Sequence, residues 1–362
     1  MTVPPDTARA WVDIDLAALV ANARTVAAAS GARLLPMVKA NGYGLGAVPV
    51  ARALDAVDPW GFGVATTGEG AELRAAGCRR PIVVATPLVP EAVEAVLAAD
   101  LRPSIGDVES LRAWRARSDR AFHLEIDTGM GRAGIRWDDR DALAAAAAEL
   151  RACAGWEGVY THFHSADSDP AGIRCQWDRF QAALDSLPRR PALVHAANSA
   201  AALEGRAYAA DMVRPGIFLY GGAAGKAEPR PVAALRARVV AVRRVPPGDT
   251  VSYGGAWRAE RETTVATVAV GYADGVHRGA APSAAPAPRW VEHRGRTVPV
   301  VGRVTMDMTM IAVDGPVTPG DVVTVFGGVV SLDAQADAAG TISYELLTSL
   351  GTRLPRRYSG VT

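Results

Sequence analysis

The chain has 362 residues, with 39 Lys and Arg against 38 Asp and Glu, and its formal net charge is +1. This balance indicates no nucleic-acid or membrane partner, and no apolar run is long enough to span a bilayer. The first residues lack a signal-peptide core, and the three widely spaced cysteines predict neither disulfides nor a metal site. We therefore expect a cytoplasmic protein, of two domains or one large barrel with an appendix.

Up to about residue 228, short β-branched runs alternate with Ala- and Leu-rich segments of helical length. A helix is expected from Leu16 to about Ala29, with Asp15 as its N-cap. Eight strands are expected, at residues 34–39, 61–65, 81–85, 101–104, 121–127, 158–163, 192–196 and 213–220. Eight strand–helix units are typical of a closed (β/α)8 barrel, so we predict an α/β fold with a TIM-type barrel over residues 1–228.

The alternation of strand and helix segments ends at residues 223–231, a Gly- and Pro-containing segment that we interpret as a linker. Short strand-like runs follow at residues 235–245, 263–270, 297–301, 308–313 and 321–326, and turn sequences separate them. Residues 229–362 are therefore predicted to form a mostly-β C-terminal domain.

Lys39 is one of only two lysines in the chain, the other being Lys226 in the linker. It follows an apolar run and precedes the glycine-rich turn 40–44. Arginine stays protonated and cannot form an imine, whereas a desolvated lysine can lose its proton and attack a carbonyl. Lys39 therefore indicates either imine chemistry or a surface lysine whose stem packs on apolar neighbours.

Several other polar groups are expected at the carboxyl ends of the barrel strands, which form the catalytic face of this fold. Each alone is more often structural than catalytic, but their joint placement favours a site. They are Arg132 after the fifth strand, His162 at the end of the sixth, Asn198 and Ser199 after the seventh, and Arg214, Gly216 and Ile217 in the eighth.

A phosphate group suits the loops after the seventh and eighth strands. Ser199 offers a hydroxyl there, and Gly216 lacks a β-carbon, so the Gly216–Ile217 amides can approach an anion closely. A phosphate anchor and an imine-forming lysine on one face indicate pyridoxal 5′-phosphate. Neither a Walker sequence nor a well-placed Gly-x-Gly-x-x-Gly is present.

Five motifs in order resemble the alanine racemase family. They are VKANGYG at residues 38–44, DTGMGR at 127–132, VSYG at 251–254, GYADG at 271–275 and VGRVTMD at 301–307. The resemblance runs from Trp11 to Arg356. It implies a barrel joined to a β domain, a homodimer with shared active sites and pyridoxal 5′-phosphate as cofactor. The implied reaction interconverts L-alanine and D-alanine and supplies D-alanine for peptidoglycan.

The resemblance also assigns roles to single residues. Lys39 is the imine lysine and one of two bases, and Tyr253 is the second base, contributed by the other subunit. The remaining roles are Tyr43, Asn198, Ser199, Gly216 and Ile217 around the cofactor, Arg214 at its pyridine nitrogen, His162 beside the catalytic tyrosine, Arg132 and Met306 at the substrate carboxylate, Tyr272 at the entry, and Asp307 in support.

These roles are chemically consistent. A tyrosine is a poor base at neutral pH unless its anion is favoured, and a hydrogen bond to His162 near cationic Arg214 provides that help. Arginine has only donors and no proton to spare, so Arg214 keeps the pyridine nitrogen unprotonated.

The chain departs from the family pattern at four positions. Glu125 stands where many members carry a carbamylated lysine that orients Arg132; its shorter reach calls for a water or a shifted arginine. Leu45 replaces a common histidine, Thr305 a cysteine or serine, and Thr352 a phosphate-binding tyrosine of some members.

The residues leave other functions open. The closest alternative is a racemase for serine or another amino acid. A barrel decarboxylase is disfavoured because the chain has no Gly-Gly-Gly phosphate loop and no cysteine in the C-terminal domain. A non-catalytic cofactor-binding protein is usually a lone barrel, so the β domain with Tyr253 argues against it. A chiral assay against a panel of L-amino acids separates these alternatives.

Overall fold

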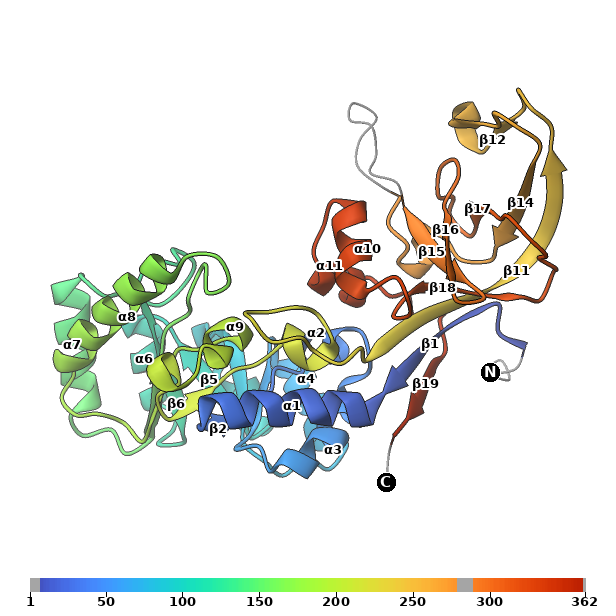
Figure 1. Cartoon of the computed structure of the whole chain (residues 1–362). Coiled ribbons are helices and arrows are strands. Elements are labelled where there is room, and N and C mark those ends of the chain that lie inside the picture. The colour runs from blue at the N-terminus through green and yellow to red at the C-terminus, as the bar shows by residue number, and fades with distance from the viewer. Residues whose placement is uncertain (1–6, 279–288, 361–362) are drawn as a thin grey trace.

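Eight parallel strands form the first sheet in the computed structural model, which describes residues 7–278 and 289–360 (Figure 1). Their order is β2-β10-β9-β8-β6-β5-β4-β3. The bounds are β2 (Arg33–Leu34), β3 (Phe62–Val64), β4 (Ile82–Pro87), β5 (Arg102–Ile105), β6 (Phe122–Asp127), β8 (Trp156–Tyr160), β9 (Leu193–His195) and β10 (Met212–Val213), with β7 (Ile135–Arg136) paired to β6. A parallel bridge between Met37 and Gly63 joins the first strand segment to β3, so the predicted barrel is confirmed.

Helices alternate with these strands and cover the outside of the barrel (Figure 1). The first, α1 (Leu16–Ser30), begins after Asp15, whose side chain accepts a hydrogen bond from the backbone N–H of Ala18, so this predicted helix and cap are confirmed. The others are α2 (Lys39–Tyr43), α3 (Ala47–Leu54), α4 (Thr67–Ala75), α5 (Val93–Ala98), α6 (Val108–Arg115), α7 (Arg140–Leu150), α8 (Pro170–Asp185) and α9 (Ser199–Leu203).

Two predicted strands are shorter than expected. The first does not run to Lys39, which instead begins the turn of α2. The eighth ends at Val213, and a 3-10 helix, η5 (Ile217–Tyr220), replaces the rest of it. Pro215 lies between them and has no backbone N–H for a ladder, which accounts for the break.

The second domain is mostly β, as predicted, and contains the long curved strand β11 (Figure 1). Its strands are β11 (Ala233–Val245), β12 (Thr250–Val251), β13 (Trp257–Arg258), β14 (Thr263–Val268), β15 (Trp290–His293), β16 (Arg296–Pro299), β17 (Thr309–Ala312), β18 (Val322–Phe326) and β19 (Arg356–Ser359). Two helices that the pattern did not predict, α10 (Leu332–Ala339) and α11 (Ser343–Thr348), lie on the side facing the barrel (Figure 1).

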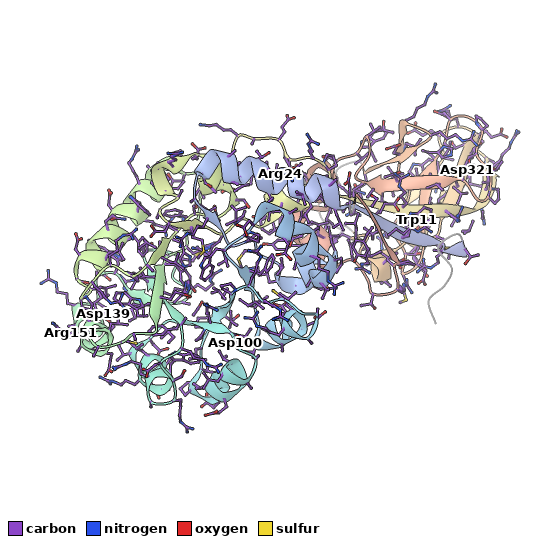
Figure 2. All side chains as sticks on the ribbon, turned by 90° about the horizontal axis from the view of Figure 1, so that it is seen from below. Trp11, Arg24, Asp100, Asp139, Arg151 and Asp321 are labelled. Carbon is purple, nitrogen blue, oxygen red and sulfur yellow. The ribbon has the colours of Figure 1, made fainter. Side chains whose placement is uncertain are left out.

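The strand at the start of the described chain, β1 (Ala10–Asp15), belongs to this second sheet, although we had placed these residues in the barrel domain. It pairs antiparallel with β11 and parallel with β19. Figure 2 shows Trp11 of β1 in the same domain as Asp321, whereas Asp100 lies on the barrel. Buried apolar side chains of both domains join in one cluster, so the domains pack on a shared core.

Candidate active site

A cavity of about 150 Å³ lies inside the barrel, next to the loops that follow the strands. Its wall brings together ten residues that the sequence placed in the site. These are Lys39, Tyr43, Glu125, Arg132, His162, Asn198, Ser199, Arg214, Gly216 and Ile217. The segments that carry them come from six different parts of the barrel, as expected for a site at the strand ends.

The backbone turn after Lys39 is left-handed. Ala40, Asn41 and Tyr43 have φ values of 52–53°, which residues with a side chain rarely adopt. The Glu69 carboxylate holds this turn by accepting a hydrogen bond of 2.7 Å from the N–H of Ala40. The backbone is therefore strained in this turn, and the turn fixes the position of Lys39.

The Lys39 ammonium is half-buried in a positively charged cavity. Burial lowers the pKa of Lys39, and the nearby cations Arg132 and Arg214 lower the pKa further, while Glu69 opposes them. A lower pKa increases the fraction of neutral amine, the form that accepts a proton or attacks a carbonyl. Lys226, in contrast, is exposed and pairs with Glu204 at 3.5 Å.

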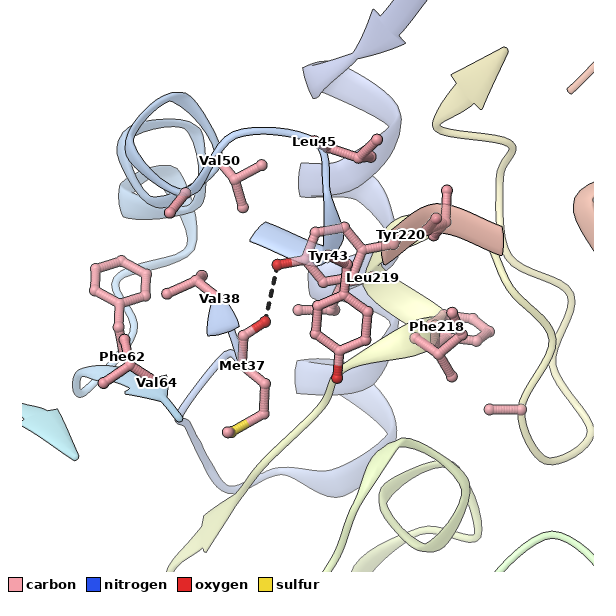
Figure 3. Packing of buried hydrophobic residues seen from close by; sticks show 14 of the residues in the cluster. Met37, Val38, Tyr43, Leu45, Val50, Phe62, Val64, Phe218, Leu219 and Tyr220 are labelled. Atoms are coloured by element: carbon pink, nitrogen blue, oxygen red, sulfur yellow. Dashed lines mark hydrogen bonds between the residues drawn. The ribbon is translucent and has the colours of Figure 1, made fainter. Parts of the chain in front are cut away.

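One end of the cavity is shaped for a close approach to backbone. The N–H of Gly216 donates to the Ser199 hydroxyl at 2.8 Å, and a β-carbon at Gly216 would lie 2.3 Å from the hydroxyl of Tyr43. The Tyr43 ring stacks on Tyr220 with centroids 4.4 Å apart, and Tyr220 donates to the carbonyl of Met37 (Figure 3). Only glycine at position 216 leaves this end of the cavity open.

Asn198 has a local structural task. Its side chain accepts a hydrogen bond from the N–H of Ala201 and caps α9. Asn198 therefore orients the turn that carries Ser199, which accounts for its place in the wall.

Arg214 is buried, and several hydrogen bonds hold its guanidinium in place. One guanidinium nitrogen donates to His195 at 2.8 Å, and the other to the carbonyl of Thr161 at 2.7 Å and to His162 Nδ1 at 3.2 Å. Burial lowers the pKa of Arg214 to about 10, so it remains charged at neutral pH.

His162 lies two residues beyond the end of β8 and is neutral at physiological pH. Burial, followed by the charges of Arg214, Arg132 and Lys39, lowers the pKa of His162 to about 3. Because Nδ1 accepts from Arg214, Nε2 must carry the proton. His162 is therefore a hydrogen-bond donor through Nε2.

Glu125 and Arg132 share the cavity wall but form no ion pair among the described residues. Glu125 is buried and Arg132 is exposed. Burial raises the pKa of Glu125, and a hydrogen bond from Tyr160, followed by the charges of Arg132 and Arg214, opposes this. Glu125 and Arg132 thus face one cavity without an ion pair, and the role of Glu125 in orienting Arg132 stays a prediction.

Besides apolar residues and a glycine, the wall contains four polar side chains that the sequence did not predict, namely Ser104, Tyr160, His195 and Tyr344. Tyr160 precedes His162 by two positions, and strand periodicity could have shown that the two share a face. Ser104, Tyr160 and Glu125 lie together in the wall, and the Tyr160 hydroxyl interacts with both of the other side chains. Such polar groups in the wall suit a polar ligand.

Tyr344 is a residue of the wall that the sequence did not predict. Thr352, which stands where some family members have a phosphate-binding tyrosine, lies in an exposed turn. Tyr344 of α11 reaches the cavity instead, and its ring lies 6.0 Å from that of Tyr43. The C-terminal domain therefore does bring a tyrosine to the cavity of the same chain.

The four predicted residues of the β domain lie outside this cavity. Tyr253 is 67% exposed and lines a separate, open concavity of about 900 Å³. Met306 and Tyr272 are exposed as well, and the backbone N–H of Tyr272 donates to Thr305 at 3.0 Å. Asp307 pairs with Arg353 at 2.6 Å. One chain thus holds the predicted site in two separate parts.

The residues present fit pyridoxal 5′-phosphate. The Gly216 end leaves room for an anion beside the Tyr43 and Ser199 hydroxyls, and Lys39 supplies the amine. Arg214 offers guanidinium donors on the same wall. Polar side chains, among them Ser104, Tyr160 and Glu125, line the rest of this wall.

Comparisons with known proteins agree with this geometry. Residues 14–224 match the model of the alanine racemase N-terminal domain, and residues 232–358 that of the C-terminal domain. The alanine racemase of Deinococcus radiodurans is 40% identical, covering 96% of this chain and 99% of the relative. That of Carboxydothermus hydrogenoformans is 38% identical over 96% and 99%.

Solved structures give the same result. Alanine racemase from D-cycloserine-producing Streptomyces lavendulae has a TM-score of 0.88 and 34% identity, covering 100% of this chain and 99% of that one. The Bacillus anthracis enzyme with bound L-Ala-P has a TM-score of 0.87 and 31% identity, over 99% and 97%. Within the described residues, none of the helices has the length and apolar character to cross a membrane. The chain belongs to the alanine racemase family.

Proposed function

We propose that this chain interconverts L-alanine and D-alanine with pyridoxal 5′-phosphate held in the Lys39 cavity. The family depends on this cofactor. One observation carries the proposal: a lysine of lowered pKa, an open glycine end and a buried charged guanidinium share one wall. When bound, the cofactor supplies an electron sink that makes the α-proton of an amino acid removable.

The barrel residues then have distinct tasks. Tyr43, Ser199, Gly216 and Ile217 hold the phosphate. Lys39 holds or releases a proton at Nζ on one face of the α-carbon, as its lowered pKa permits. Arg214 would face the ring nitrogen and, because a guanidinium has only donors and no proton to spare, would not protonate it.

The second base must come from elsewhere. Inversion needs a proton acceptor on the opposite face of the α-carbon. Three tyrosines, Tyr43, Tyr160 and Tyr344, line the cavity. Burial raises the pKa of each, so each stays a neutral phenol at physiological pH and is a poor proton acceptor. We assign the second base to Tyr253 of a partner subunit, and its exposure in an open concavity supports this assignment.

The shared site implies a homodimer. The His162 Nε2–H donor of one subunit is then available to the tyrosine of the other, where it favours the tyrosine anion. Arg132 and Met306 receive the substrate carboxylate, Tyr272 lines the entry, and Asp307 holds its loop through Arg353. The three free cysteines suit a reducing compartment, so we place the protein in the cytoplasm, where it supplies D-alanine for peptidoglycan.

The test is a chiral assay of the cofactor-loaded protein against a panel of L-amino acids. We expect D-alanine to form faster than any other D-amino acid. Faster formation of D-serine would show that serine, the alternative, is the preferred substrate. Carbon dioxide release without any D-amino acid would show a decarboxylase and contradict the proposal.

A further inference from the structure

A chain of hydrogen bonds crosses the interior of the barrel from Arg214 to the opposite end of the strands. Arg214 Nη1 donates to His195 Nδ1 at 2.8 Å, and His195 Nε2 lies 2.8 Å from His123 Nδ1. His123 Nε2 lies 3.2 Å from Glu157 Oε2, which also accepts from Arg102 Nε at 2.7 Å. We call these four residues, Arg214, His195, His123 and Glu157, the buried polar chain.

The direction of every bond in the buried polar chain follows from its two ends. A guanidinium has only donors, so His195 Nδ1 must accept, and His195 Nε2 must carry the proton. That proton points to His123 Nδ1, which must therefore accept, so the proton of His123 lies on Nε2. The last proton meets Glu157, whose ionised carboxylate has only acceptors. A single arrangement therefore satisfies all the groups.

The charges agree with this arrangement. Burial lowers the pKa of His123 and of His195, so both rings are neutral at physiological pH. Burial raises the pKa of Glu157, but the hydrogen bonds from His123 and Arg102 outweigh this and lower the pKa. The carboxylate is therefore ionised when both histidines are neutral.

The barrel is shaped to hold these rings. His123 and His195 are fully buried, whereas apolar side chains fill most barrel interiors. Gly158 pairs with His123 across β8 and β6, and a β-carbon there would lie 2.5 Å from His123 Nδ1. Tyr160 stacks on His195 with ring centroids 5.0 Å apart. Gly158 thus leaves room for His123, and the Tyr160 ring covers His195, so each imidazole has a specific place in the barrel interior.

Glu157 lies far from the mouth of the cavity. It is the second residue of β8, and Arg102 is the first residue of β5, so both lie at the amino ends of parallel strands. Residues at this end of a barrel usually contribute to its stability rather than to catalysis. The hydrogen bonds, however, connect Glu157 to a guanidinium in the candidate active site.

We propose that Glu157 is a positioning residue for Arg214. Its carboxylate fixes the tautomers of His123 and His195, and thereby the orientation of the Arg214 guanidinium. With the acceptor at Glu157 in place, His195 Nδ1 is always free to accept from Arg214. Without it, the Nε2–H of buried His123 loses its acceptor, which favours a shift of that proton to Nδ1. A matching shift in His195 places a proton on Nδ1, opposite the Arg214 donor, so the two tautomers compete. Arg214 also donates to His162, so the same carboxylate helps to keep His162 Nε2 protonated. The catalytic part of this inference rests on the proposed function, whereas the tautomer part does not.

The first test is nuclear magnetic resonance of the ligand-free protein labelled with 15N in its six histidines. We expect His123 and His195 to be neutral with the proton on Nε2. In Glu157→Leu, which removes the acceptor, we expect mixed tautomers at both rings. Glu157→Gln keeps an acceptor oxygen and should retain the wild-type tautomers. Arg102→Gln is the matched control, because it removes the ion pair but leaves the acceptor of His123.

The second test is alanine racemisation by the cofactor-loaded variants. Loss of one positioned hydrogen bond should lower kcat of Glu157→Leu by about three- to tenfold with little change in KM, and Glu157→Gln should recover most of it. A proton on Nδ1 of either wild-type histidine overturns the proposal, even if Glu157→Leu fails to fold. Unchanged tautomers in a folded Glu157→Leu overturn it too. Confirmed tautomers without any alanine turnover contradict the proposed function and leave the tautomer assignment standing.

Discussion

The Lys39 cavity and the Tyr253 concavity are organised in opposite ways. In the barrel, side chains such as Arg214 are buried and held by several hydrogen bonds each. In the β domain, the turn before the predicted base is held while the base itself is exposed. Ser252 has a φ of 72° and its hydroxyl donates to the carbonyl of Arg303, but its neighbour Tyr253 is 67% exposed. The difference agrees with the proposal that one chain completes the barrel half of a site and offers the Tyr253 half to a partner subunit.

The largest effect should come from the barrel half. Lys39→Ala removes the only amine in the cavity, so we expect racemisation and the visible absorbance of the bound cofactor to be lost. Lys226→Ala is the control, since that side chain is 86% exposed, and it should leave both readouts unchanged. Cofactor absorbance that survives dialysis in Lys39→Ala would remove Lys39 from its proposed role.

The β-domain half should give a large but selective effect. Tyr253→Phe should slow racemisation on the order of 10²–10⁴-fold, because one of two proton acceptors is gone. Cofactor binding should be retained, and the α-proton of D-alanine should still exchange with deuterated solvent. Equal exchange from both enantiomers in this variant would contradict the two-base assignment.

Mixing the two inactive variants tests whether the halves come from different subunits. Random exchange of Lys39→Ala and Tyr253→Phe chains should restore about a quarter of the wild-type activity, since half of the dimers are mixed and each has one intact site. Mass spectrometry of the intact dimers would demonstrate the exchange. No recovery after demonstrated exchange would place both residues in one chain.

Glu125 should give a smaller effect, because it does not pair directly with Arg132. Glu125→Gln keeps the shape and removes the charge, and we expect about a two- to tenfold loss in kcat/KM. Removal of bicarbonate should leave the wild-type rate unchanged, because a carboxylate needs no carbon dioxide. An unchanged rate in Glu125→Gln with cofactor bound would limit Glu125 to a structural task.

The smallest effect should be on stability, in the β domain. The N–H of Thr318, followed by His293 and Arg294, lowers the pKa of Asp321 to about 2. A lowered folded-state pKa contributes stability above the unfolded value near 3.9, and this contribution is lost as the pH falls through the folded value. Asp321→Asn should therefore lower Tm by roughly 2–4 °C at pH 7.

The Tm difference between wild type and Asp321→Asn should shrink as the pH falls from about 4 to about 2. Asp314→Asn is the matched control, because Asp314 and Arg261 form an exposed pair at 3.2 Å that should contribute little. A difference in Tm that is constant with pH would show that the charge of Asp321 is not responsible.

Local pattern was sufficient for the barrel and for its charged residues. Strand periodicity located all eight strands, although the first and the eighth end earlier than predicted, and the scarcity of lysine pointed to Lys39. Pairings between distant segments were not visible: β1 pairs with strands that begin at Ala233 and Arg356. Tyr344 was missed for the same reason, since its place in the wall depends on how α11 packs over the barrel. The direction of the hydrogen bonds from Arg214 to Glu157 requires the register of several strands at once.

The position of β1 sets the order in which the chain can fold during its synthesis. The barrel strands all lie between Arg33 and Val213, so they leave the ribosome before the first partner of β1, which starts at Ala233. Its other partner, β19, is among the last described residues. β1 therefore stays an unpaired strand while the barrel assembles beside it. A chain that stopped after the barrel would leave the backbone N–H and C=O groups of this strand exposed, which favours aggregation.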